Sequence, residues 1–157
     1  MSIRPAKTGD TSMIRELLEQ LGYPDPAMAS TDPSADPANP SRIGTGLAVR
    51  LERMLQDPAE VMLVWEEDGA VLGFLSLHFI PQIAVEGDFA RISYFAVESA
   101  ARSRGVGLAM EQEAERLARE RGCHLIEVHC HERRTRAHAF YGRQGYEEAP
   151  KYLIKRL

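Results

Sequence analysis

The feature that most constrains the fold is a pair of apolar runs joined by an Asp-Gly dipeptide. The runs cover Val61–Trp65 and Val71–Ile80, and residues 67–70 (EDGA) connect them. Asp-Gly suits the two central positions of a tight hairpin turn, because both positions require a positive φ that Asp and Gly tolerate. The chain is therefore predicted to contain two antiparallel strands, and with them a β-sheet, at its centre.

Apolar residues at helical spacing on both sides of this hairpin predict helices. Before it, Asp10 is the expected N-cap of a helix that Gly22 ends, with an apolar stripe at i, i+3, i+4 and i+7. The predicted strands are Ile3–Ala6, Val61–Trp65, Val71–Ile80, Arg91–Val97, Leu125–Cys130 and Tyr152–Leu157, and the predicted helices are 10–22, Gly46–Gln56, Val106–Arg121 and Thr135–Arg143. This order indicates an α/β domain with one mixed central sheet, flanked by about four helices.

The chain length of 157 residues fits one domain, spanning 1–157. Within it, residues 23–41 contain five of the nine prolines and almost no large apolar side chains. Such a segment cannot offset its ordering entropy by burial, so we expect a flexible Pro-rich loop inside the domain.

Composition restricts the class of protein. The two cysteines form neither a CxxC pair nor a disulfide framework, no apolar run is long enough to span a membrane, and the N-terminus lacks a signal-peptide core. We therefore expect a soluble cytoplasmic protein that binds no membrane. The net charge of −4 argues against nucleic acid as the main partner. Residues 61–90 carry five acids and no Lys or Arg, whereas 91–157 carry thirteen bases and nine acids, a division that suits an anionic ligand in the C-terminal part and a cationic one elsewhere.

The residues that carry chemistry lie where a predicted strand ends and a helix begins. After Val97, the pattern Arg102-x-x-Gly105-x-Gly107 opens the helix. Glycines at such a junction let backbone N–H groups approach a ligand, and the helix N-terminus adds unpaired donors and about half a unit of positive charge. Arg102 and Arg104 add guanidinium groups that suit phosphate oxygens. The pattern is compatible with a pyrophosphate site, but a glycine-containing turn with two solvated arginines explains it equally well. A Walker loop and a dinucleotide-binding fingerprint are both absent.

A second motif, AHAFYGRQGY at 137–146, begins thirty residues after Gly107. The two motifs, in this order and at this spacing, resemble the signature of the GNAT superfamily of N-acetyltransferases. That signature has [RQ]-x-x-G-x-[GA] at a strand-to-helix junction and A-x-x-F-Y-x-x-x-G-[FY] in a later helix. The N-terminal IRPA segment, the helix pair and the hairpin are also similar, so the resemblance covers nearly the whole chain except for the Pro-rich loop. The ending ERRTRAHAFYGRQGY resembles a branch of small bacterial enzymes.

The resemblance implies the GNAT acyl-CoA N-acyltransferase fold, in which the central parallel strands four and five splay apart. It implies that the pantetheine arm of acetyl-CoA lies between them and bonds to the backbone of Phe95 and Val97 on strand four. An N–H near Val97 would polarise the thioester carbonyl. The other residues that it places at the cofactor are Arg102, Arg104, Gly105, Val106 and Gly107, whose amides would hold the pyrophosphate, and Ala137 and Phe140 of the second motif.

The implied reaction is direct attack of a neutral amine on the thioester, with Tyr141 in the position of the family's proton donor to the CoA thiolate. A phenol, with a reference pKa of about 10, stays protonated at neutral pH and can donate. A Tyr merely packed on an apolar helix face is the alternative. Many relatives carry a Glu on strand four as base, but this chain has Ser93-Tyr94 there. The candidates for the base are His78, which is more simply read as a structural histidine, Glu86 or Asp88, and a water relay.

A second departure concerns Arg134. Many family members carry an Asn here that bonds to pantetheine, whereas this chain has Arg134 within the run RRTR at 133–136. That run either holds the 3′-phosphate of CoA or is solvated surface. We expect no metal site, because His129 and His131 would share one strand face and make an incomplete ligand set, and we interpret Cys130 between them as core rather than as a nucleophile.

We therefore expect an acetyl-CoA-dependent N-acetyltransferase whose acceptor is a small cationic amine or a protein amino group. The acidic stretch 61–90 and the Pro-rich loop are expected to border the acceptor site. The competing hypothesis is a non-catalytic acyl-CoA-binding regulatory module, and a third is a protein-interaction domain that works through the Pro-rich loop. The acceptor, the acyl chain length and homodimer formation are left open.

Overall fold

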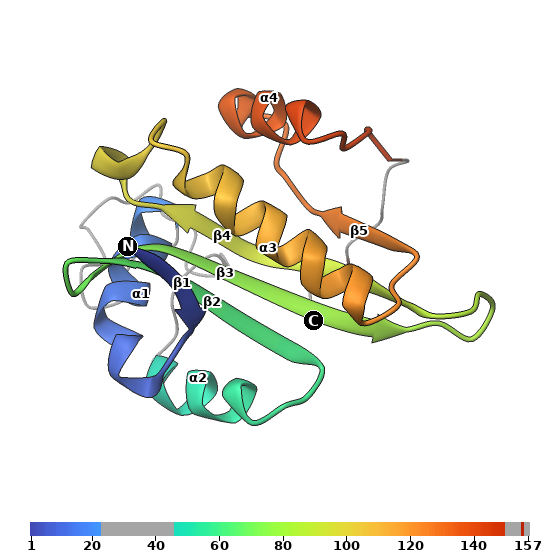
Figure 1. Cartoon of the computed structure of the whole chain (residues 1–157), viewed down its shortest axis with the longest axis horizontal. Helices are drawn as coiled ribbons and strands as arrows, with labels where there is room; N and C mark the ends of the chain where they lie inside the picture. Colours follow the sequence, from blue (N-terminus) through green and yellow to red (C-terminus); the bar gives the residue numbers. More distant parts are fainter. Residues whose placement is uncertain (23–45, 150–154, 156–157) are drawn as a thin grey trace.

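The computed structural model describes residues 1–22, 46–149 and 155, and Figure 1 shows a sheet with helices on both sides. Its strands are β1 (Ser2–Pro5), β2 (Glu60–Glu67), β3 (Ala70–Pro81), β4 (Asp88–Val97) and β5 (Leu125–Val128). Its α-helices are α1 (Thr11–Gln20), α2 (Leu47–Leu55), α3 (Val106–Glu120) and α4 (Thr135–Arg143), with short 3-10 helices η1 (Thr8–Asp10) before α1 and η3 (Ser99–Ala101) before α3. The Pro-rich loop 23–41 and, apart from Lys155, the expected last strand Tyr152–Leu157 lie outside the described residues.

The sheet is mixed, as the sequence predicts. Its strand order is β1-β2-β3-β4-β5; the first four strands are antiparallel to their neighbours, and β5 runs parallel to β4. The hairpin between β2 and β3 turns at Asp68 and Gly69, whose φ angles are 51° and 78°. Two consecutive positive φ values are the geometry for which Asp-Gly is selected in two-residue hairpins.

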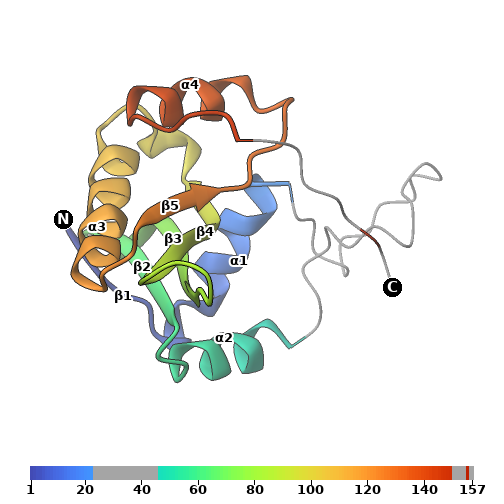
Figure 2. The same cartoon turned by 90° about the vertical axis from the view of Figure 1, so that its right-hand side faces the viewer.

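Helices cover both faces of the sheet, which separates two apolar clusters (Figure 2). Alternation along β3 produces the separation: Phe74 packs with α1 and α2, whereas the neighbouring Leu75 packs with α3. The cluster beneath α3 contains Leu63, Leu75, Leu77, Phe79, Ala90, Ile92, Ala101, Val106, Met110, Ala114 and Ala118. Helix α4 lies apart from both clusters, across the end of β4 (Figure 1), and none of its side chains is fully buried.

Gly73 on β3 sets how closely α3 approaches the sheet. A Cβ at this position would lie 2.6 Å from Sδ of Met110 and 3.4 Å from Cγ1 of Val106, both on the buried face of α3. Real Cβ atoms essentially never come within 3.0 Å of another atom. The first two turns of α3 can therefore rest directly on β3 only because residue 73 has no side chain.

The observed elements differ from the predicted ones mainly at their ends. Strand β4 begins at Asp88, three residues before the predicted start, because Asp88 and Phe89 pair with β3. Strand β5 ends at Val128, two residues before Cys130. Asp10 occupies the N-cap of α1, but its side chain makes no capping hydrogen bond. Its carboxylate instead accepts from the backbone N–H of Lys7 at 2.8 Å and from both terminal nitrogens of Arg4 at 2.8 and 3.0 Å, because the buried carboxylate is better satisfied by a cation.

None of the helices in the described part of the chain is both long and apolar enough to cross a membrane.

Candidate active site

Strands β4 and β5 part before β4 ends. Their parallel pairing runs from Phe89 opposite Leu125 to Ile92 opposite Val128 and stops there, while β4 continues to Val97. A bulge lies at the same point: Tyr94 is opposite Ser76 and Ile92 is opposite Leu77, so Ser93 has no partner on β3. A bulge adds a residue to one strand and bends it, and this one directly follows the last residue of β4 that pairs with β5. The expected splay between strands four and five is thus observed.

The backbone of Phe95 and Val97 faces the gap that this parting leaves. The N–H of Glu98 donates to the carbonyl of Leu72 at 2.8 Å, which directs Glu98 towards the β3 side. Because N–H groups alternate sides along a strand, those of Val97 and Phe95 point the opposite way, along the unpaired edge of β4. An extended ligand can therefore add to this edge as a further strand would.

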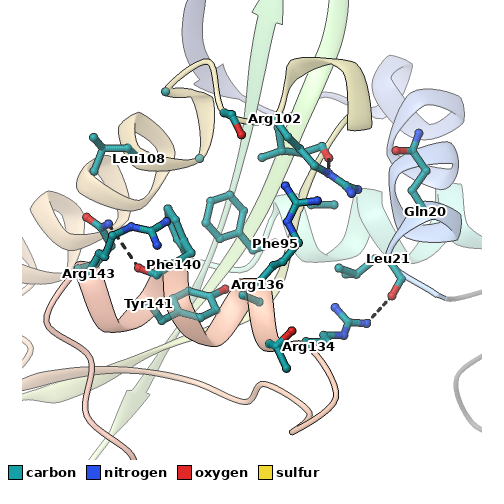
Figure 3. Close-up of a pocket in the computed structure, with 18 of the residues that line it drawn as sticks. Gln20, Leu21, Phe95, Arg102, Leu108, Arg134, Arg136, Phe140, Tyr141 and Arg143 are labelled. Atoms are coloured by element: carbon teal, nitrogen blue, oxygen red, sulfur yellow. Dashed lines mark hydrogen bonds between the residues drawn. The ribbon is translucent and has the colours of Figure 1, made fainter.

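A cleft of about 710 Å³ occupies this gap (Figure 3). It is bounded by the end of β4, the loop before α3, the first turn of α3, helix α4 and the end of α1. The lining residues are Gln20, Leu21, Phe95, Ala96, Val97, Arg102, Ser103, Gly105, Gly107, Leu108, Arg133, Arg134, Thr135, Arg136, Ala137, Phe140, Tyr141, Arg143 and Gln144. The cleft thus collects Phe95, Val97, Arg102, Gly105, Gly107, Arg134, Ala137, Phe140 and Tyr141 from among the predicted site residues.

The loop that opens α3 is shaped by two residues in the left-handed region. Ser103 has a φ of 62° and Gly105 a φ of 85°; Gly105 is the N-cap of α3, and no side chain caps it. A non-glycine residue at positive φ is uncommon and strained, and such residues cluster at ligand sites. A Cβ on Gly105 would meet nothing within 4 Å, so the space over this amide is open. The loop therefore presents the positive end of a helix of 15 residues to the cleft.

The cleft is strongly cationic. Arg102, Arg133, Arg134, Arg136 and Arg143 line it, and no Asp or Glu appears among the described residues of its lining. Nε of Arg102 donates to the carbonyl of Val97 at 2.9 Å, which ties this guanidinium to the end of β4. Nη2 of Arg134 donates to the carbonyl of Leu21, the C-cap of α1 (Figure 3). This charge balance selects an anionic ligand.

Arg104 departs from the expected arrangement. Its Nη2 lies 2.6 Å from Oε1 of Glu67 on β2, and the residue does not line the cleft. The Glu67 carboxylate, at the end of β2, holds the Arg104 guanidinium outside the cleft. Any contribution of Arg104 to the cleft is therefore limited to its backbone. Val106 likewise turns its side chain into the core beneath α3 and is 2% exposed.

Tyr141 lies in the cleft wall, with its hydroxyl directed towards the side of Arg136 in Figure 3. Its ring packs between Phe140 and Tyr146, with ring centroids 5.2 Å from each. Burial is the main cause that raises the pKa of Tyr141 above its ordinary value. The phenol therefore stays protonated over the whole neutral range and is available as a proton donor.

His78 and the two acids considered as bases lie elsewhere. Leu77 packs towards α3, so the neighbouring His78 points to the opposite face, where its Nδ1 is 3.7 Å from Oε1 of Glu60. Asp88 is at the start of β4, 3.8 Å from Nε of Arg121, and Glu86 is in the turn before it. None of the three lines the cleft, because all lie towards the end of the sheet where β4 begins rather than where it ends.

The acids of residues 61–90 also do not gather at the cleft. Glu66 pairs with Arg4 and Glu67 with Arg104 at one end of the sheet, while Asp88 is at the other end. The arginines of the C-terminal part thus gather at the cleft, whereas the described acids of residues 61–90 form no common site for a cationic ligand.

Three cleft residues, Arg143, Gln20 and Leu21, were not anticipated from the sequence. Arg143 follows the predicted residues Arg136 and Phe140 at i+7 and i+3, on the same face of α4, and this periodicity is a signal that could have identified it. Gln20 and Leu21 gave no such signal, because they reach the cleft through the packing of α1 on the sheet. Among the described residues, no group of three or more potential metal ligands lies together. Cys130 follows the end of β5, is only half-buried and belongs to neither apolar cluster, so the prediction that it is a core residue is wrong.

Comparison with known proteins identifies the family. The family model described as Acetyltransferase (GNAT) family matches residues 28–146. A curated aminoglycoside N(6′)-acetyltransferase type 1 of Klebsiella aerogenes is 38% identical over 68 residues, which cover 42% of this chain and 45% of that protein.

Two solved structures share the fold over nearly their full length. A transcriptional regulator from Bacillus halodurans has a TM-score of 0.79 at 22% identity, with 99% of each chain covered. An aminoglycoside N-acetyltransferase in complex with CoA has a TM-score of 0.73 at 16% identity, with 99% of this chain and 98% of that one covered. Because the family model spans well over half of the residues, this chain belongs to the acetyltransferase (GNAT) family.

Proposed function

We propose that this protein transfers an acetyl group from acetyl-CoA to a primary amine. The observation that carries the proposal is the cleft, where the open edge of β4, the N-terminus of α3 and five arginine side chains meet without an acid among the described lining residues. Coenzyme A has the complementary chemistry: its pantetheine amides suit a strand edge, and its diphosphate and 3′-phosphate suit helix amides and guanidinium groups. A neighbour of the same fold was solved in complex with CoA.

Each part of the cleft then has an assigned partner. The N–H groups of Phe95 and Val97 hold the pantetheine arm, and the Val97 N–H polarises the thioester carbonyl. The amides of residues 102–107, with the Arg102 guanidinium, hold the diphosphate. Arg136 and Arg143 face the cleft from one side of α4 and suit the remaining phosphate.

The reaction follows from these positions. The lone pair of a neutral amine attacks the thioester carbonyl carbon, a C–N bond forms, and the C–S bond breaks. Tyr141 donates its phenolic proton to the departing sulfur and regains one from solvent. The amine gives up its proton to water, because the described lining of the cleft contains neither a carboxylate nor an imidazole.

The acceptor that we propose is a small molecule with a primary amine, and aminoglycosides are the first class to test. This choice is supported by the local similarity to an aminoglycoside N(6′)-acetyltransferase. A protein amino group is the second class, and the same assay separates the two.

The test measures free CoA released from acetyl-CoA across a panel of aminoglycosides, polyamines and peptide N-termini. We expect turnover with at least one small amine. Tyr141→Phe should reduce kcat by about 100-fold or more while leaving the affinity for CoA unchanged, since Phe keeps the ring and removes only the donor. Equal kcat values for Tyr141→Phe and the wild type would refute the assignment of Tyr141.

A non-catalytic acyl-CoA-binding module is the second candidate, and the lack of a base among the described lining residues favours it. In that case CoA binds, but no amine on the panel is acetylated. Transfer to any acceptor above the uncatalysed rate excludes this candidate.

A further inference from the structure

Glu111 is a buried carboxyl that the proposed mechanism does not use. It lies on α3 and is 2% exposed. Burial is the main cause that raises its pKa above the ordinary value. Asp10, another buried acid, is bonded to the Arg4 guanidinium, whereas Glu111 accepts a hydrogen bond at Oε1 from the hydroxyl of Tyr146, at 3.1 Å. Burying a carboxyl group costs free energy, so a buried glutamate at this position calls for a physical reason.

Tyr146 is attached to Tyr141 in two ways. The chain leaves α4 through Gly145, which has a φ of 88°, and the N–H of Tyr146 then donates to the carbonyl of Tyr141 at 3.1 Å. The left-handed glycine brings Tyr146 back against the helix, where its ring lies 5.2 Å from that of Tyr141. Any displacement of Tyr146 is therefore transmitted to both the backbone and the ring of Tyr141.

Glu111 is also well placed to locate α4 as a whole. It is one turn from Gly107 on the same face of α3, and a Cβ at Gly107 would lie 3.7 Å from the ring of Phe140. Helix α3 thus lies against the Phe140 ring of α4 and bonds to Tyr146, just after α4, on either side of Tyr141 in the sequence. Because α4 has no fully buried side chain of its own, its position depends on such contacts, together with the bond from Arg134 to Leu21 at its N-terminus and the contact between the Phe140 and Phe95 rings.

We propose that Glu111 is a positioning residue for acetyl transfer: by accepting the hydrogen bond of Tyr146, it holds α4 so that the Tyr141 hydroxyl points into the cleft. The inference rests on the proposed function, since it concerns the residue assigned as proton donor there. Glu111 does not touch the reacting atoms and acts only through Tyr146.

The experiment compares Glu111→Leu, which removes the acceptor, Glu111→Gln, which keeps an acceptor oxygen, and Tyr146→Phe, which removes the donor. Glu113→Leu on the same helix is the matched control, because Glu113 pairs with Arg116 on the outer surface. For each variant we measure kcat, the KM for acetyl-CoA, the Kd for CoA by calorimetry, the unfolding temperature, and hydrogen exchange of the α4 amides.

We expect Glu111→Leu and Tyr146→Phe to lower kcat about ten-fold or more. The Kd for CoA should rise by a smaller factor than kcat falls, since the edge of β4 and the N-terminus of α3, which bind most of the cofactor, are unchanged. The α4 amides should exchange faster in both variants. Glu111→Gln should stay close to the wild type. The double variant Glu111→Leu/Tyr146→Phe should recover thermal stability, because no unpaired polar group remains, but should not recover kcat.

A merely structural role predicts that kcat follows stability, so recovery of both in the double variant would overturn the proposal. Unchanged α4 exchange in Tyr146→Phe would overturn it as well, and a Glu111→Gln variant as impaired as Glu111→Leu would contradict the acceptor role. If the wild-type protein transfers no acetyl group, the proposed function fails. The exchange data then still report whether the Glu111–Tyr146 bond holds α4.

Discussion

Replacing Gly73 with Ala should force α3 away from the sheet. The new Cβ would lie 2.6 Å from Sδ of Met110 and 3.3 Å from Cβ of Trp65, and Met110 is completely buried. A relaxed contact is near 3.5–4.0 Å, so the Met110 sulfur has to move by roughly 1 Å. Overpacking of this kind costs about 1–3 kcal/mol. For a chain of this size the unfolding temperature should fall by roughly 3–10 °C.

The consequence should extend to the cleft, because Met110 and Val106 lie in the first two turns of α3, directly after the loop 102–105. We therefore expect the Gly73→Ala variant also to bind CoA more weakly. The control is Gly9→Ala, since a Cβ at Gly9 would meet nothing within 4 Å. Its unfolding temperature and CoA affinity should match those of the wild type.

Urea unfolding of Gly73→Ala, Met110→Ala and the double variant measures the contact directly. Met110→Ala alone should cost about 2–5 kcal/mol, because it leaves a cavity. The double variant should be more stable than the sum of the single losses by about 1–2 kcal/mol, since the shortened side chain makes room for the methyl group. Strict additivity, or a Gly73→Ala variant as stable as Gly9→Ala, would refute the reasoning.

Three further outcomes are expected. Arg102→Gln should raise the Kd for CoA about ten-fold. In the same titration Arg104→Gln should change this Kd by no more than about two-fold, because the Arg104 guanidinium is already paired with Glu67. Gly105→Ala should lower the free energy of unfolding by about 1 kcal/mol, because Ala is strained at the positive φ of this position. If this variant binds CoA as tightly as the wild type, the open space over the Gly105 amide is not used by the ligand. The hydrogen bonds from Arg4 lower the pKa of Asp10 in the folded state. The stabilisation from this pair is therefore complete above the unfolded-state pKa and is lost as the pH falls below about 5. In urea unfolding at a series of pH values, Asp10→Asn should reduce the loss of stability at acid pH.

Much of the architecture could be predicted because short-range chemistry determines it. The Asp68-Gly69 turn specifies a hairpin locally, and the glycines 105 and 107 mark the start of α3 without reference to the rest of the chain. The family resemblance then placed the splay between strands four and five.

The bulge at Ser93 could not be predicted, because it depends on which β3 residue pairs with each β4 residue. That register is selected by packing on both faces of the sheet and leaves no trace in the composition of β4. The same applies to His78: strand alternation predicts two faces but does not say which face turns towards α3.

Side-chain partners were the least predictable part of the candidate site. Arg102 and Arg104 are equivalent in the sequence motif, yet one bonds to Val97 and the other to Glu67, which lies far away in the chain. The Glu111–Tyr146 bond joins residues 35 positions apart in the sequence, and only the closure of α4 over α3 brings them together.

The most direct test of the account is a calorimetric titration of the full chain with CoA at two temperatures. We predict saturable binding of one CoA per chain, with a Kd in the micromolar to submillimolar range that rises with salt, as phosphate recognition by arginines requires. If neither temperature shows heat of binding with the protein at about 100 μM and CoA in excess, the cleft does not hold coenzyme A and the proposed function is contradicted.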